Sequence, residues 1–466
     1  MKRIFTLLAT LLLSPLAAVH AADASQKPNI LFILADDMRP DCIHTLGHPI
    51  VETPHLDALV RDGMIFTRAV AAYPICFVSR AEILTGTTAF RNGVGYRGTK
   101  IDPALKTWAG TLRDAGYRTW YCGKWHNDGR PTQRGYEATR GLFSGGGGPK
   151  GSTSLPDHAG RKATGYTGWT FKTPDGDVDL AKGVGLTPDT DHHIADAAIE
   201  FIRLRADTPF FLHVNFTAPH DPRLLPTGYE HKYNPANIPL PANFRPQHPF
   251  EHGNLTGRDE LLLPKPLKED DLRAELAAYY ACITNMDAQI GRIVAALRES
   301  GQLENTVIVF SSDQGLAMGS HGLLGKQNLY EHTFRVPFIF RGPGIPRGQR
   351  SEADCYLRDV FPTTCELAGV AIPNTVESQS LAPIFHGATK PIYPYVIGYY
   401  TDTQRGVREG DWKLIHYPRI GKMQLFNLRT DPDELRDLAE HPENAETLNH
   451  LRAQLDGWLK QHGDGG

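Results

Sequence analysis

The chain has 466 residues, of which 41% are hydrophobic, and its formal net charge is −3. This length exceeds one average domain and allows one large domain with a smaller unit beside it. Scattered Lys and Arg residues give no basic stripe for nucleic acid or a membrane surface, and six dispersed cysteines are too few for a disulfide scaffold.

The N-terminal residues have the pattern of a secretory signal peptide. Lys2 and Arg3 precede a short apolar core at 5–13, and the small residues ending at Ala21 fit a cleavage site. The apolar core is too short to span a bilayer, and no later apolar run is long enough for a membrane helix. The sequence therefore predicts a signal peptide over 1–21, a mature chain without a membrane span, and a periplasmic or secreted location.

The next elements alternate between strand and helix. Runs of strand length, most of them strongly apolar, lie at 28–35, 117–122, 209–216 and 306–312. Helical patterns lie at 55–62, 104–115, 189–205 and 270–299. Near-continuous apolar runs suit strands buried on both faces. The alternation predicts an α/β domain over 22–390, with a large, mixed, mostly parallel sheet sandwiched by helices.

Two segments interrupt this alternation. Residues 141–185 are rich in Gly, Thr and Pro, and residues 222–266 are dense in Pro. Long irregular segments in a compact domain are usually functional loops or disorder, so we interpret both as insertions around the mouth of a pocket. Either could equally be a plain surface loop.

A change in composition near residue 391 indicates a second unit. Short antiparallel strands are predicted at 395–401, 406–408, 412–417 and 423–427, followed by an amphipathic helix at 443–461. These elements predict a small C-terminal α+β subdomain over 391–466.

Polar residues gather where the four strand-like runs end. The four groups are Asp36-Asp37, Gly123-Lys124-Trp125-His126, Ala218-Pro219-His220-Asp221 and Asp313-Gln314. Ligands of open α/β sheets bind outside the carboxyl ends of the strands, so these groups predict one shared active site. Its candidate metal ligands offer only oxygen, which favours Ca²⁺ first and Mg²⁺ second over zinc.

The segment from Cys76 to Arg80, followed by Leu84-Thr85-Gly86, resembles the maturation signature of the type I, formylglycine-dependent sulfatases of the alkaline-phosphatase-like superfamily. In that family a maturation enzyme oxidises the cysteine to formylglycine. The family usually has Pro where this chain has Val78. The resemblance extends over nearly all of the mature chain through the strand that ends at Asp37, the Gly-Lys-Trp-His element, Ala218-Pro219-His220 and Ser312-Asp313-Gln314-Gly315.

The resemblance implies a role for each matched position. Asp36, Asp37, Asp313, Gln314 and Cys76 would bind the metal. As formylglycine, Cys76 would be the nucleophile, and Arg80 would hold its hydroxyls. Lys124 and Lys326 would neutralise sulfate oxygens. His126 would take the proton that triggers sulfate release. His220 would protonate, or hydrogen-bond to, the leaving alcohol, with Lys326 close by, and either of the two would be the main acid.

Three further residues are candidates for contacts with the substrate. Asp221 and Arg223 follow the second histidine and could point towards a bound sugar, or form a local ion pair. His321 could bind substrate or hydrogen-bond within its own loop.

Export and the predicted pocket insertions favour a sulfate ester on a carbohydrate as the substrate. Two alternatives remain open. A phosphodiester or phosphonate monoester hydrolase of the same superfamily would share the metal edge and the modified cysteine. A non-catalytic glycan-binding protein would result if Cys76 were not matured.

Overall fold

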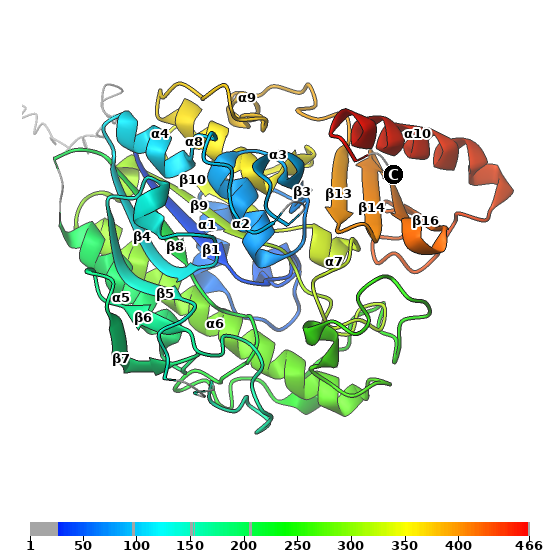
Figure 1. The fold of residues 1–466 in the computed structure, drawn as a ribbon, viewed down its shortest axis with the longest axis horizontal. Helices are drawn as coiled ribbons and strands as arrows, with labels where there is room; N and C mark the ends of the chain where they lie inside the picture. The colour runs from blue at the N-terminus through cyan, green and yellow to red at the C-terminus, as the bar shows by residue number, and fades with distance from the viewer. Residues whose placement is uncertain (1–26, 96–97, 150–151, 153, 205–206, 465–466) are drawn as a thin grey trace, which may run out of the picture.

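The structure is a computed structural model that describes residues 27–95, 98–149, 152, 154–204 and 207–464. The predicted signal peptide over 1–21 lies outside these residues. Figure 1 shows a large sheet covered by helices, with a second, smaller sheet at one end of the molecule. Within the described ranges, no helix is both long enough and apolar enough to cross a membrane.

The large sheet has ten strands. In spatial order they are β11 (Gln349–Ser351), β2 (Met64–Phe66), β10 (Phe338–Arg341), β9 (Thr306–Ser312), β1 (Asn29–Ala35), β8 (Phe210–Asn215), β4 (Arg118–Trp125), β5 (Ala138–Ser144), β6 (Thr170–Lys172) and β7 (Val178–Val184). The five strands from β9 to β5 run parallel, whereas β10, β6 and β7 form antiparallel pairs. The predicted mixed, mostly parallel sheet is therefore confirmed. A separate two-stranded sheet pairs β3 (Ala69–Val70) with β12 (Cys355–Tyr356).

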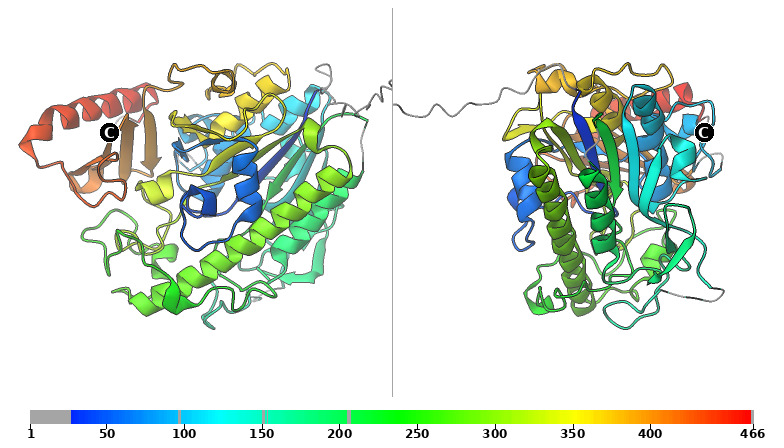
Figure 2. Two further views of the ribbon diagram at one scale, coloured as in Figure 1. Left: turned by 180° about the vertical axis from the view of Figure 1, so that it is seen from behind. Right: turned by 90° about the vertical axis from the view of Figure 1, so that its left-hand side faces the viewer.

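Helices cover both faces of the large sheet. One face packs against α1 (Pro54–Arg61), α5 (Thr190–Arg203) and α6 (Glu269–Glu299). The other packs against α2 (Cys76–Thr85), α3 (Ala89–Asn92), α4 (Trp108–Asp114), α8 (Val360–Leu367) and α9 (Ala382–Phe385). Figure 2 shows α6 running along one side of the molecule.

The central strand β1 explains why its sequence is almost entirely apolar. Phe32 and Leu34 belong to the hydrophobic core on one face, and Leu31 and Ile33 belong to the core on the other. Alternate side chains of a strand point to opposite faces, so a strand covered on both sides has no solvent-facing position. Each such burial contributes about 1.5–3 kcal/mol relative to exposure.

The C-terminal unit is an antiparallel sheet with one long helix. Its strands are β13 (Val396–Tyr400), β14 (Gln404–Glu409), β15 (Trp412–Tyr417) and β16 (Lys422–Asn427), and α10 (Ala445–Gln461) follows them. Leu451 and Leu455 of α10 are buried in the same core that covers one face of the large sheet. The short helix α7 (Glu331–Phe334) precedes β10 in the chain. The domain boundary at residue 391 stays a prediction.

Two predicted bounds were wrong for local reasons. The helix expected over 104–115 begins at Trp108, because the hydroxyl of Thr107 caps it by accepting from Gly110 N. The strand expected to end at residue 122 continues to Trp125 through a bulge between Cys122 and Gly123. Gly123 has φ 86°, and a Cβ there would lie 1.9 Å from the carbonyl oxygen of Asn215, so the bulge requires glycine.

The segment 141–185 was wrongly predicted to be irregular throughout. It contributes the end of β5 and all of β6 and β7, which extend the large sheet at one edge. The apolar signal of a strand is weak here because β7 is an edge strand with mostly partly or fully exposed residues. The other segment, 222–266, is irregular as expected, with only short 3₁₀ turns at Pro235–Asn237 and Arg258–Leu261.

Candidate active site

The carboxyl ends of the central strands bring four side chains together. Asp36 and Asp37 follow β1, Asp313 follows β9, and Cys76 begins α2. Carboxylate oxygens of the three acids and Sγ of Cys76 all lie within 4.8 Å of one another. The three acids are at most 1% exposed. We call the three acids Asp36, Asp37 and Asp313 the carboxylate cluster. This cluster lies at the edge of the sheet where the sequence predicts an active site.

The backbone at Asp37 makes this convergence possible. Successive residues of a strand point to opposite faces, so Asp36 and Asp37 would diverge in an extended chain. Asp37 instead adopts φ 70°, in the left-handed region that non-glycine residues rarely occupy. Its N–H donates to Asp313 Oδ1 at 3.1 Å, and Met38 N donates to Ser312 Oγ at 2.8 Å. These bonds fix the turn that directs both carboxylates to one place.

Cys76 is the first residue of α2 and faces the cluster. Its Sγ lies 3.3 Å from Asp36 Oδ1, and Gln314 Nε2 lies 3.3 Å from the same sulfur. Burial, together with the carboxylates of Asp313 and Asp36, raises the pKa of the Cys76 thiol well above its usual value. The unmodified side chain is therefore a neutral thiol rather than a thiolate nucleophile.

The next turn of α2 anchors the helix to β9. Ser79 Oγ donates to the backbone carbonyl of Asp313 at 2.6 Å. Arg80 Nε donates to Asp313 Oδ2 at 2.9 Å, and its Nη2 lies 2.9 Å from the same oxygen and 3.6 Å from Asp36 Oδ1. Its Nη1 donates to Asn215 Oδ1 at 2.6 Å. Arg80 thus places a permanent positive charge against two acids of the cluster.

Two buried lysines face the cluster from other elements. Lys124 lies near the end of β4, after the bulge, and donates to Asp36 Oδ2 at 2.5 Å. Lys326 donates to Asp37 Oδ2 at 2.7 Å. Although burial works against its charged form, the Asp37 carboxylate raises the pKa of Lys326 well above its usual value. With Arg80, the site therefore concentrates three basic side chains around buried acids.

The cluster is suited to a cation with oxygen ligands. Burial and the neighbouring carboxylates, opposed by Lys326, raise the pKa of Asp37 to about 7. Burial and Asp36 raise that of Asp313 to about 6. Gln314 donates to Asp37 Oδ1 at 2.5 Å through Nε2, while its buried Oε1 has no hydrogen-bond partner among the described residues. Crowded carboxylates and a free amide oxygen match the ligand preference of Ca²⁺ or Mg²⁺.

His220 approaches the same cluster from the segment after β8. Its Nε2 lies 3.6 Å from Asp37 Oδ2, and its Nδ1 lies 2.5 Å from the carbonyl oxygen and 3.2 Å from Oδ1 of Asp221. Burial, and then the charge of Lys326, lower the pKa of His220 to about 3. The ring is therefore neutral near pH 7, with its Nδ1 side held by Asp221.

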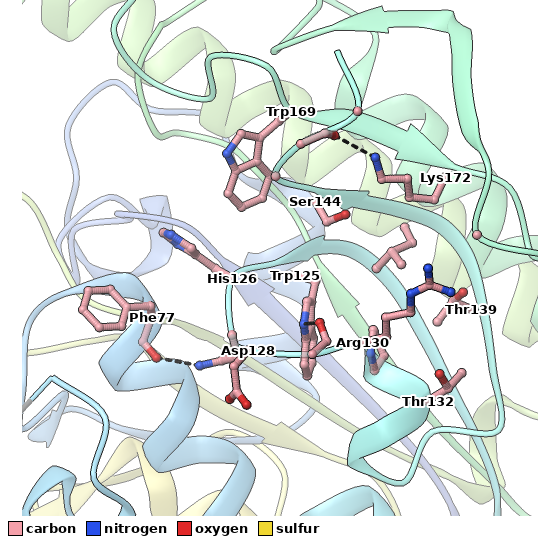
Figure 3. A pocket seen from close by; sticks show the side chains of 18 of the residues that line it. Phe77, Trp125, His126, Asp128, Arg130, Thr132, Thr139, Ser144, Trp169 and Lys172 are labelled. Carbon is pink, nitrogen blue, oxygen red and sulfur yellow. Dashed lines mark hydrogen bonds between the residues drawn. The ribbon is translucent and has the colours of Figure 1, made fainter. Parts of the chain in front are cut away.

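His126 follows β4 and lines a pocket of 760 Å³. Figure 3 shows His126 near Phe77 and Trp169, and the His126 ring meets that of Trp169 edge-on with centroids 5.2 Å apart. Its Nδ1 has no hydrogen-bond partner among the described residues. Burial, and then the charges of Lys124 and Arg80, lower the pKa of His126 well below its usual value. This side chain is thus a neutral imidazole with an unused nitrogen at the pocket wall.

The three predicted substrate contacts have other partners in the structure. Asp221 accepts from Arg258 at 3.0 Å, and Arg223 pairs with Glu275; both predicted residues are buried. A sugar contact by either residue would have to replace part of its ion pair. His321 stacks on Tyr330 with ring centroids 3.9 Å apart, and its Nε2 lies 3.2 Å from Asn243 Nδ2. For all three, substrate binding stays a prediction.

Two residues of the site were not predicted. The hydroxyl of Tyr166 donates to Asp36 Oδ2, and Asn215 accepts from Arg80. Asn215 ends β8, so the same rule about the carboxyl edge would have found it. Tyr166 comes from the Gly-rich segment, where no periodic pattern indicates which side chains turn inward.

Comparison with known families decides the identity of this arrangement. The family model described as sulfatase matches residues 28–370. The chain belongs to the sulfatase family. A second family model, described as the C-terminal part of N-sulphoglucosamine sulphohydrolase, matches residues 319–461 of this sulfatase.

Alignments with individual relatives cover nearly the whole sulfatase. It is 31% identical to an arylsulfatase of Clostridium perfringens, over 94% of this chain and 96% of the relative. It is 27% identical to an N-acetylglucosamine-6-O-sulfatase of Bacteroides thetaiotaomicron, over 97% and 91%. A solved structure in complex with its substrate D-glucosamine-2-N,6-O-disulfate is 25% identical, with a TM-score of 0.77 over 94% of this chain and 99% of that one. This sulfatase is a sulfuric ester hydrolase.

Proposed function

We propose that this sulfatase removes sulfate from a sulfated carbohydrate, using a formylglycine made from Cys76 and one divalent cation. The observation that carries the proposal is the position of Cys76 Sγ, within 4.8 Å of carboxylate oxygens of Asp36, Asp37 and Asp313. Two relatives support the carbohydrate: one is a sulfatase of N-acetylglucosamine, and the other binds a sulfated glucosamine as its substrate. The N-terminal pattern supports a periplasmic or secreted enzyme.

Two groups would complete the site. Asp36, Asp37, Asp313 and Gln314 would hold the cation, Ca²⁺ before Mg²⁺, with the converted Cys76 as a further ligand. The cation would supply Lewis acidity, and the hydrated aldehyde would supply two hydroxyls on one carbon. Conversion requires a formylglycine-generating maturation enzyme as a partner.

The basic side chains would bind and orient the sulfate. Lys124 and Lys326 reach the cluster from β4 and from the segment before α7, so they approach a bound anion from different elements. Arg80 is held by Asp313 and Asn215 and would fix the hydroxyls of the converted residue. Charges placed before the reaction stabilise a charged transition state without reorganisation.

The two histidines would move protons at separate atoms. His126 is neutral, and its free Nδ1 can accept a proton, which fits the base that triggers sulfate release. His220 donates from Nδ1 to the carbonyl oxygen of Asp221, so Nε2 of the neutral ring carries no proton. Nε2 would accept a hydrogen bond from the leaving alcohol, or protonate it only after gaining a proton itself. Lys326 contacts the same Asp37 carboxylate and could share this role.

Replacing His126 by Ala should lower kcat by about 10²–10⁴-fold, the usual contribution of a general base. Because the pKa of His126 lies below its ordinary value, lowering the pH from about 7 to about 5.5 should not reduce the wild-type rate through this residue. Steady-state kinetics across pH provide the measurement. His231→Ala, which changes an exposed histidine, is the control. An unchanged kcat in His126→Ala would contradict the assigned role.

Removing the cation with a chelator should abolish hydrolysis, and Ca²⁺ should restore it better than Mg²⁺. Added cation should also stabilise the fold, by about 2.7 kcal/mol at a concentration of one hundred times Kd. Thermal unfolding of chelated and reloaded protein measures this effect. Full activity after complete removal of divalent cations would refute a cation site at the carboxylate cluster.

A side-by-side assay tests the substrate class. Matched aryl sulfate, sulfated monosaccharides, phosphodiester and phosphonate monoester would be offered to the same preparation. We expect sulfate ester hydrolysis to dominate, with a sulfated sugar as the best substrate. Preference for the phosphodiester or phosphonate would favour the superfamily alternative instead.

A further inference from the structure

The pocket beside His126 is lined by two positively charged side chains that have no role in the proposed reaction. Arg130 and Lys172 line this 760 Å³ pocket together with Trp169. Figure 3 shows Phe77 and His126 on one side of the pocket and Arg130 and Lys172 on the other. The pocket therefore joins a residue of the proposed reaction to a basic wall across an open space.

Both cations lack an acidic partner among the described residues. Lys172 Nζ donates to the carbonyl oxygen of Gly146 at 2.8 Å and to Thr170 Oγ1 at 2.6 Å, which holds the ammonium in place without neutralising it. Arg130 lies against Gly176 in the turn between β6 and β7, where its Nη1 would be 2.9 Å from an added Cβ. Burial, and then the charge of Arg130, lower the pKa of Lys172. Two positive charges thus face each other uncompensated.

The acidic residues at the pocket do not neutralise the charges of Arg130 and Lys172. Asp128 is paired with Arg134. Asp175 lines the pocket as an exposed residue and forms no ion pair with either cation in the described chain. Like charges held close together are unfavourable unless an anion is bound between or beside them.

We infer that Arg130 and Lys172 form a subsite for a second anionic group of the substrate, a sulfate or a carboxylate, on a sugar seated against Trp169. This inference rests on the proposed function, since it places the reacting sulfate on the His126 side of the pocket. Guanidinium and ammonium groups bind both kinds of oxyanion, and an indole offers the apolar surface that a sugar ring needs. The preferred substrates are thus saccharides with at least two anionic groups.

Calorimetry with defined sugars tests the subsite. The protein is the Cys76→Ala variant loaded with Ca²⁺, because this substitution prevents turnover. The probes are N-acetylglucosamine-6-O-sulfate, glucosamine-2-N,6-O-disulfate, and N-acetylglucosamine-6-O-sulfate linked to a glucuronic acid. We expect at least one probe with two anions to bind about tenfold tighter than the monosulfate. Of the two probes with two anionic groups, the one that binds more tightly identifies the second group as a sulfate or a carboxylate.

The same titrations in the Arg130→Ala/Lys172→Ala background should remove this gain, whereas Lys162→Ala should keep it, since Lys162 is an exposed cation of the same segment that does not line the pocket. Thermal unfolding checks that each variant is folded. Absence of any gain from a second anion, or a gain that survives the double substitution, would overturn the inference. Aryl sulfate hydrolysis by the wild type is measured separately: its absence would defeat the proposed function, whatever the titrations give.

Discussion

Cys76→Ala should abolish hydrolysis of sulfate esters, with a loss of kcat of about 10⁴-fold or more, because it removes the only precursor of the proposed nucleophile. The substitution leaves the basic side chains and both histidines in place, so substrate should still bind. Turnover of an aryl sulfate and calorimetric binding of a sulfated sugar are measured on the same protein. Loss of turnover with retained binding is the expected pair of results.

The control for this variant is Cys282→Ala. Cys282 is also buried, but it lies in α6 and bonds weakly to the carbonyl oxygen of Leu224 rather than facing the carboxylate cluster. It should keep kcat near the wild-type value. If Cys76→Ala retains more than a small fraction of wild-type activity, the nucleophile must be another group.

Arg80→Met should be the most destabilising substitution at the site. It leaves Asp313 and Asp36 buried without their guanidinium partner, and breaking a buried pair in this way typically costs about 3–5 kcal/mol. Activity should fall as well, since Arg80 orients the segment that carries Cys76. Chemical denaturation in the presence of chelator measures the stability of the metal-free protein.

Arg91→Met provides the matched comparison. Arg91 pairs with Glu377 near the surface at 3.2 Å, where ion pairs contribute about 0–1 kcal/mol. A small effect is therefore expected for Arg91→Met. Equal losses of stability in the two variants would mean that Arg80 does not hold the carboxylate cluster together.

The central fold could be predicted because its strands carry a strong signal. β1 and β9 are covered on both faces, so their sequences are nearly continuous apolar runs whose limits are clear. The polar residues that follow such runs must meet at one edge when the strands are parallel. This rule predicts that Asp36, Asp37, Asp313 and Gln314 lie together.

Other features of the site depend on tertiary structure that leaves little trace in sequence. Lys124 reaches Asp36 only because the bulge at Gly123 shifts the register of β4. Tyr166 and Lys172 come from a segment in which β6 is only three residues long and the edge strand β7 is exposed, so no apolar pattern predicts the inward turn of the tyrosine or the pocket wall. The burial of Arg223 against Glu275 was equally hidden, since the two residues are far apart in the chain.

The conversion of Cys76 to formylglycine is tested most directly by a peptide mass spectrum across Cys76, recorded on protein purified from its native host. We expect an aldehyde in place of the thiol in a large fraction of the peptide, despite Val78 at the position where the family usually has Pro. An unmodified Cys76 throughout an active preparation would contradict it, because the hydrolysis would then have to use a different nucleophile.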